Sequence, residues 1–164
     1  MLNGFKLLIA AFMIIAISGV PARAQDFSFS TPEGQTVTLS SLRRNVVVLL
    51  FSGAQDPQRR EGLKALGSVG ERFQGKNVKI FWVSVNPASE VTNDQLKSFS
   101  TSVPLLRDTN QAAFKRFSGK VAQLPTIVVL DLEGNPFGQP RGGFNPNSDF
   151  INDLASIIEN LLKR

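Results

Sequence analysis

Three short, predominantly apolar runs constrain the fold of this 164-residue chain more than any other feature. They span residues 46–51 (VVVLLF), 78–85 (VKIFWVSV) and 126–130 (TIVVL). Apolar runs of this length are typical of strands that are buried on both faces of a sheet. Because segments with helical character separate the runs, we expect an α/β protein with a central mixed β-sheet flanked by helices.

The segments between and around these runs predict the remaining elements. Asp56 and Pro57 predict a helix start, with Asp56 as the N-cap and Pro57 at the first helical position. The clearest helix is the last one, in which apolar residues from Phe150 to Leu162 form a single stripe. The other expected elements are strands at 27–30, 36–39 and 103–106, helices from 56 to about 73, at 94–99 and at 110–117, and a turn at 131–135 that returns toward 142–143.

The first 24 residues have the layout of a secretory signal. A short polar start containing Lys6 precedes an uncharged apolar run at 7–17, and Ala22-Arg23-Ala24 supplies the small residues that a signal peptidase reads. The run is shorter than the roughly 20 residues of a comfortable membrane span. We therefore expect a signal peptide at 1–24 and one domain at 25–164, exported to the periplasm or another extracytoplasmic compartment with no stable membrane span after cleavage. An uncleaved N-terminal anchor is the alternative.

Charge offers little evidence for a nucleic-acid partner. Loss of Lys6 and Arg23 reduces the basic residues from 18 to 16 against 13 acidic ones, so the net charge falls from +5 to +3. Arg43-Arg44 and the cluster Arg59-Arg60-Lys64 lack interleaved aromatic residues. We interpret both clusters as solvated faces and expect no nucleic-acid binding.

The chain contains no Cys, His or Tyr. It therefore has no disulfide, no thiolate nucleophile and no imidazole base or ligand. Asp108, Asp131 and Glu133 match no cation loop and are assigned to turns. We expect no cofactor, no metal and no catalytic residue of the usual nucleophilic kind. The aromatic residues are interpreted as core, with Trp82 half-buried.

The order and spacing of three segments resemble the thioredoxin-like redoxins, a superfamily that includes exported thiol–disulfide reductases and the alkyl hydroperoxide reductase/thiol-specific antioxidant group. The segments are residues 27–51 (FSFSTPEGQTVTLSSLRRNVVVLLF), 80–87 (IFWVSVNP) and 103–135 (VPLLRDTNQAAFKRFSGKVAQLPTIVVLDLEGN). The resemblance implies a thioredoxin-like fold over nearly the whole mature chain. It also implies that Leu124-Pro125-Thr126 stands in the place of the family's cis-proline.

The sequence departs from the family at the active-site position. The resemblance places Asp56 on the first cysteine of Cys-X-X-Cys, Arg59 on the second, Pro57 on the intervening proline and Gln55 on the tryptophan that precedes the motif. A peroxidase alignment also needs a cysteine in this loop. The family's redox chemistry therefore cannot be transferred to this chain, and we expect it not to be a thiol oxidoreductase or peroxidase.

Two interpretations of the substituted site stay open. Asp56 is either a plain helix cap or one half of an exposed ion pair with Arg59, three residues along the helix. Pro125 either shapes the turn into a core strand or, as the resemblance implies, presents backbone to an extended partner segment. The second alternative defines a surface of Gln55, Asp56, Pro57 and Arg59 with Leu124, Pro125 and Thr126.

These observations yield two main functional hypotheses. The first is a redox-inactive, exported thioredoxin-like protein that binds a protein or extended peptide at the cis-proline loop. The second is a non-catalytic component of a thiol–disulfide oxidoreductase or antioxidant system. A hydrolase or lyase based on carboxylates has little support, because no second acid converges on Asp56 in the sequence.

Overall fold

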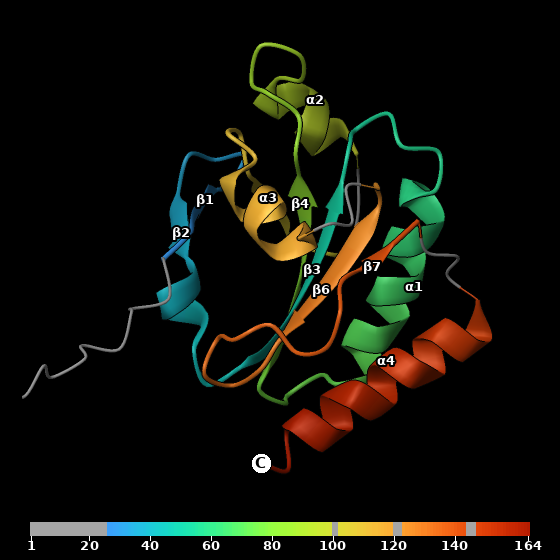
Figure 1. The fold of residues 1–164 in the computed structure, drawn as a ribbon. Coiled ribbons are helices and arrows are strands. Elements are labelled where there is room, and N and C mark those ends of the chain that lie inside the picture. Colours follow the sequence, from blue (N-terminus) through green and yellow to red (C-terminus); the bar gives the residue numbers. More distant parts are fainter. Residues whose placement is uncertain (1–25, 100–101, 120–122, 144–146) are drawn as a thin grey trace, which may run out of the picture.

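A mixed β-sheet forms the centre of the protein (Figure 1). The computed structural model describes residues 26–99, 102–119, 123–143 and 147–164. The predicted signal peptide lies outside these residues. Within the described residues the sheet has seven strands in the order β2-β1-β5-β4-β3-β6-β7. The elements are β1 (Ser28–Ser30), β2 (Thr36–Thr38), the 3₁₀ helix η1 (Leu39–Leu42), β3 (Val46–Ser52), α1 (Arg59–Arg72), β4 (Val78–Ser84), α2 (Asn93–Ser98), β5 (Leu105–Arg107), α3 (Ala112–Ser118), β6 (Thr126–Leu130), β7 (Arg141–Gly142) and α4 (Ser148–Leu161).

The three apolar runs form the central strands, as predicted. β3 pairs in parallel with β4 along its whole length, from Val46 opposite Val78 to Ser52 opposite Ser84. β6 pairs with the other edge of β3 in antiparallel orientation, so the sheet is mixed. All seven residues of β3 are buried, which agrees with a strand covered on both faces.

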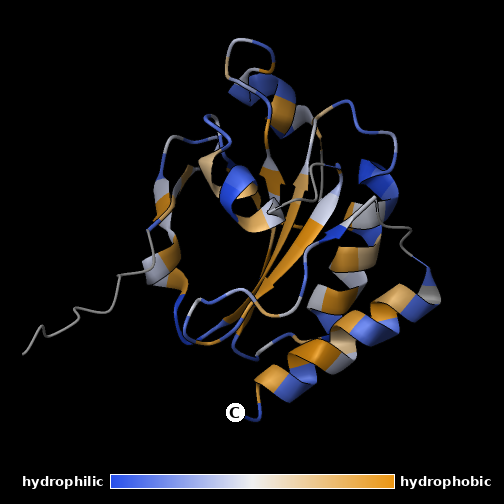
Figure 2. Ribbon diagram, viewed as in Figure 1, coloured by the Kyte–Doolittle hydropathy of each residue, from blue (hydrophilic) through white to orange (hydrophobic). Residues whose placement is uncertain are grey.

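Alternate residues of β3 belong to two separate cores. Val46, Val48 and Leu50 pack beneath α1 and α4, whereas Leu49 and Phe51 pack on the opposite face with the N-terminal strands and α3. Figure 2 shows the apolar central strands and the two-sided character of α4, whose apolar stripe was predicted from its spacing. The fold is α/β, with helices on both faces of the sheet (Figure 1).

The last residues of β3 and the first residues of β6 lie at the same end of the sheet. Because β6 runs antiparallel to β3, the register that pairs Phe51 with Thr126 brings Pro125 beside Ser52 and Gly53. The loop that leads into α1 and the loop that leads into β6 are therefore neighbours. None of the helices within the described residues is long and apolar enough to cross a membrane.

Candidate functional site

The loop between β3 and α1 is anchored to the loop that follows β4. The backbone N–H of Ala54 donates a hydrogen bond of 2.7 Å to Oδ1 of Asn86. Two successive turns follow, in which the N–H of Asp56 donates to the carbonyl of Gly53 and the N–H of Arg59 donates to the carbonyl of Asp56, each at 3.2 Å. The backbone of residues 53–59 is thus held by the Asn86 side chain and by two successive turns.

The predicted helix start, with Asp56 as N-cap and Pro57 as the first helical residue, is wrong by two residues. α1 begins at Arg59 with Gln58 as its N-cap, and the first bond of α-helical span runs from Gly62 N–H to the Gln58 carbonyl at 3.0 Å. Asp56 Oδ1 accepts a bond of 2.9 Å from the Gln58 N–H, so its carboxylate stabilises the preceding turn. Asp56 Oδ2 is buried and has no hydrogen-bond partner among the described residues.

The ion pair between Asp56 and Arg59, one of the two alternatives for this site, is absent from the ion pairs of the described residues. The guanidinium of Arg59 instead donates from Nη1 to the carbonyl of Ala54. Its carbon Cζ lies 3.9 Å from the ring centroid of Phe99 and 5.2 Å from that of Trp82. Burial lowers the pKa of Arg59, the nearby charge of Arg60 lowers it further, and Asp56 acts in the opposite direction.

Trp82 forms the floor beneath Arg59. The sequence predicted a half-buried indole, but Trp82 is completely buried and its Nε1–H donates to Ser52 Oγ at 2.9 Å. The Trp82 and Phe99 rings are 6.0 Å apart in an edge-to-face arrangement. The indole is more deeply buried than expected because Phe99 and Arg59 close over it from α2 and α1.

The loop before β6 contains the cis-proline that the resemblance implied. The Leu124–Pro125 bond is cis, and the Pro125 carbonyl accepts a bond of 2.8 Å from the Gly143 N–H. Thr126 is buried as the first residue of β6, and its hydroxyl donates to the Gln123 carbonyl. Leu124 is half-buried, and no hydrogen bond joins its own N–H or carbonyl to another described residue.

The seven residues predicted as a partner surface therefore lie on two neighbouring loops and on the first residues of the elements that follow them, Arg59 of α1 and Thr126 of β6. Gln55 and Pro57 are exposed, and Asp56, Arg59 and Leu124 are half-buried. Pro125 and Thr126 are buried, so they shape this surface from below. A hollow of about 350 Å³ is lined by residues of the first loop and the start of α1.

Arg107 supports this region and was missed by the sequence analysis. It is 4% exposed, and its guanidinium donates to the carbonyl of Val91 at 2.7 Å, to the carbonyl of Asn86 at 3.4 Å and to Oδ1 of Asn93. Desolvation lowers its pKa. Arg107 thereby fixes the loop between β4 and α2, including the backbone of Asn86. Nothing in its local sequence distinguishes it from a surface arginine, because its partners are at least 14 residues away.

The acids considered as metal ligands make hydrogen bonds to backbone. Asp108 Oδ2 accepts from the Phe114 N–H at 2.7 Å, and Asp131 Oδ1 accepts from the N–H groups of Glu133 and Asn135. Asp131 and Glu133 lie in the predicted turn between β6 and β7. Among the described residues, no group of three or more potential ligands is arranged to hold a metal ion.

The mixed sheet, the cis-proline and the turn before α1 define a thioredoxin-like protein whose active-site turn contains no cysteine. The chain belongs to the AhpC/TSA family, which matches residues 20–135.

Known relatives agree with this assignment. The thiol-disulfide oxidoreductase ResA of Bacillus subtilis is 22% identical over 136 residues, which span 83% of this chain and 74% of ResA. Among solved structures, a DsbE-type thiol:disulfide interchange protein from Chlorobium tepidum superposes with a TM-score of 0.70 at 20% identity, covering 85% of this chain and 94% of that protein. The exposed lipoprotein thioredoxin of Streptococcus pneumoniae gives a TM-score of 0.67 at 19% identity, covering 80% and 98%.

Proposed function

We propose that this chain is an exported thioredoxin-like protein without redox activity, which binds an extended segment of a protein partner at the cis-proline loop. The backbone N–H and carbonyl groups of Leu124 carry the proposal. They lie beside the substituted turn and make no hydrogen bond within the described residues. A backbone segment that presents both groups at the end of a strand is suited to pairing with an added extended peptide.

The turn at residues 56–59 supports a role in binding without thiol–disulfide exchange. Asp56 and Arg59 occupy the places of the two cysteines, and each is held by local contacts, Asp56 by the Gln58 N–H and Arg59 by the Ala54 carbonyl and the Phe99 ring. Thiol–disulfide exchange requires a thiolate, and the sequence contains no cysteine. Export is supported by the predicted signal peptide and by two structural neighbours, an interchange protein of the DsbE type and an exposed lipoprotein thioredoxin.

A photo-crosslinking amino acid placed at Gln55 tests the binding site. In the cells that produce the full chain, we expect irradiation to yield a defined adduct from position 55. The control position is Lys76, which is exposed and precedes β4 at the opposite edge of the sheet. Equal adducts from both positions, or an adduct from Lys76 alone, would place partner binding elsewhere. Reduction of insulin above the blank rate would contradict the absence of thiol chemistry.

A second candidate is a non-catalytic component of a thiol–disulfide oxidoreductase or antioxidant system. It is favoured by the retained cis-proline frame and by the description of the relative ResA as a thiol-disulfide oxidoreductase. The two candidates differ in the identity of the adduct. A cysteine-bearing redox enzyme crosslinked to position 55 supports the second candidate, and a protein without redox cysteines supports the first.

A further inference from the structure

A cavity of about 380 Å³ lies between the start of α1 and the end of α2, next to the proposed peptide site. Its lining includes three cationic side chains, Arg59, Arg60 and Lys64, together with the ring of Phe99 and the residue Ser98. No acidic residue is among the described residues that line it. Asp56 and Glu61 line the hollow on the other side, and Arg59 and Arg60 contribute to both.

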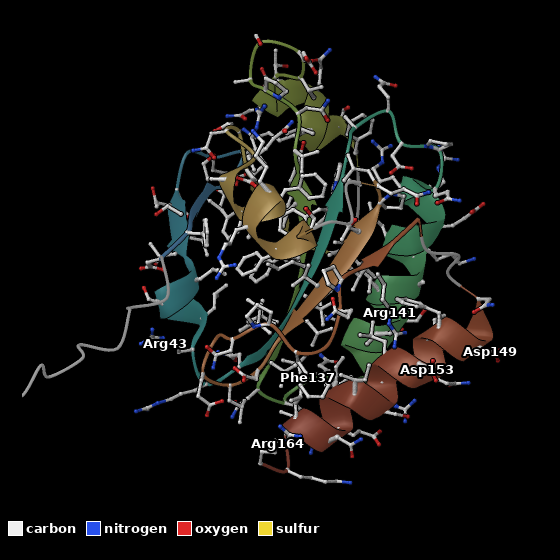
Figure 3. The ribbon with its side chains drawn as sticks, viewed as in Figure 1. Arg43, Phe137, Arg141, Asp149, Asp153 and Arg164 are labelled. Atoms are coloured by element: carbon white, nitrogen blue, oxygen red, sulfur yellow. The ribbon has the colours of Figure 1, made fainter. Side chains whose placement is uncertain are left out.

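Two of the three cations, Arg59 and Arg60, are the first two residues of α1, and Lys64 follows one turn later. Positive charge near a helix N-terminus is unfavourable, and the like charges of Arg60 and Lys64, four residues apart, destabilise the helix further. The ion pairs of the described residues lie elsewhere. Figure 3 shows Arg141 on β7 and Asp153 on α4, where Nη1 and Oδ2 are 3.9 Å apart. Within the described part of the chain, neither ion pair involves Arg59, Arg60 or Lys64.

The position of Arg59 makes the cavity selective for a small anionic group. Its guanidinium is held by the Ala54 carbonyl and lies 3.9 Å from the Phe99 ring centroid, so a binding partner need not immobilise it. A guanidinium has five N–H donors in a planar fork, and the Ala54 carbonyl accepts from Nη1. Burial lowers the pKa of Arg59 most, the charge of Arg60 lowers it further, and a bound carboxylate would oppose both effects.

We infer that the partner segment is acidic, with an Asp or Glu side chain that enters the cavity and pairs with Arg59, Arg60 and Lys64 while the peptide backbone lies along the loop at Leu124. This inference rests on the proposed function, because the same peptide must occupy both places. Arg59 and Arg60 line both hollows, so the carboxylate of an Asp or Glu on an extended peptide can pair with them from either side. A phosphate-rich polymer would need basic side chains along a longer path.

Three extended peptides that differ at two central positions provide the test. One carries Glu-Glu, one Gln-Gln and one Lys-Lys within the same uncharged flanking sequence. Affinity for the full chain is measured by calorimetry at low and at moderate salt, and the site is mapped by amide chemical shifts. We expect the Glu-Glu peptide to bind about tenfold more tightly than the Gln-Gln peptide at low salt, the Lys-Lys peptide to bind most weakly, and the differences to shrink as salt is added.

The double variant Arg60→Glu/Lys64→Glu should reverse this order. Both residues are exposed, so the fold should be retained, and Arg60→Gln/Lys64→Gln gives a milder change that should abolish the preference without reversing it. The matched control Lys76→Glu/Lys115→Glu makes the same change in net charge at exposed positions outside the cavity and should preserve the order.

The possible failures are distinguishable. Equal binding of all three peptides, with shifts at Gln55 and Leu124, overturns the acidic preference and leaves the peptide site in place. Absence of shifts at those residues with every peptide overturns both proposals. Heparin or a DNA oligonucleotide that binds as tightly as the Glu-Glu peptide, through the same two basic residues, identifies a general polyanion surface and overturns the inference.

Discussion

Replacing Arg59 tests whether this side chain has a structural role at the start of α1. Its guanidinium donates to the Ala54 carbonyl and lies over the rings of Phe99 and Trp82. The hydrogen bond from a charged donor contributes about 1.5 kcal/mol. The cation–π contact, in a half-buried setting, contributes about 1 kcal/mol. The Arg59→Met variant retains an unbranched apolar stem over the rings and loses both interactions, so the free energy of unfolding should fall by about 2.5 kcal/mol.

Urea unfolding followed by the fluorescence of Trp82, the only tryptophan, measures this change. With a denaturant dependence of about 2 kcal/mol per molar urea, the midpoint should fall by roughly 1 M. Arg60→Met is the matched control, because Arg60 is exposed and should change the unfolding free energy by less than about 0.5 kcal/mol. Equal, small effects of the two variants at an unchanged denaturant dependence would refute a stabilising role for Arg59.

Three further changes test other parts of the structure. The double variant Asp56→Cys/Arg59→Cys restores Cys-Pro-Gln-Cys beside the cis-proline and should reduce insulin above the blank; no gain would mean that more than sulfur has been lost. Arg107→Met leaves buried carbonyls without donors and should lower the unfolding free energy, measured by urea titration, by about 3 kcal/mol, whereas a loss below about 1 kcal/mol would contradict its anchoring role. Hydrogen bonds from the hydroxyl and the amide of Ser40 hold the pKa of Asp26 below its ordinary 3.8, so this stabilisation is present above about pH 4 and is lost as the pH falls through the folded-state pKa. Asp26→Asn should therefore flatten the acid limb of a stability–pH curve, and an unchanged limb would show that the bond does not contribute.

The central strands could be predicted from the sequence because a strand that is buried on both faces consists almost entirely of apolar residues. A strand such as β3 has no solvent-facing position, so it appears as an uninterrupted apolar run with turn residues at its ends. The last helix was predictable for a similar reason, since its apolar stripe repeats at helical spacing. Order and type of elements therefore followed from local patterns.

The site was less predictable because its contacts join segments far apart in the chain. Asp-Pro is compatible both with a helix start and with a turn that precedes one. The structure has the turn, in a loop that the distant side chain of Asn86 anchors through the Ala54 N–H. The spacing of Asp56 and Arg59 permitted contact between them. It gave no indication that the Arg59 guanidinium would instead lie over the ring of Phe99, which is 40 residues further along the chain.

Asp56 and Arg59, which the resemblance places on the family's two cysteines, consequently have different roles. Asp56 satisfies the N–H of Gln58 within the turn, so its replacement by Asn should retain most of the local structure through an amide oxygen. Arg59 links α1 to the ring of Phe99, and no shorter side chain spans that contact while carrying a charge in a planar fork. A cysteine at position 59 would leave the rings of Trp82 and Phe99 uncovered and would remove one positive charge from the cavity. Arg59 instead provides a cation that is held in place over these rings. Under the proposed function this surface recognises a charged group in place of thiol–disulfide exchange, and the acidic-peptide experiment tests that consequence directly.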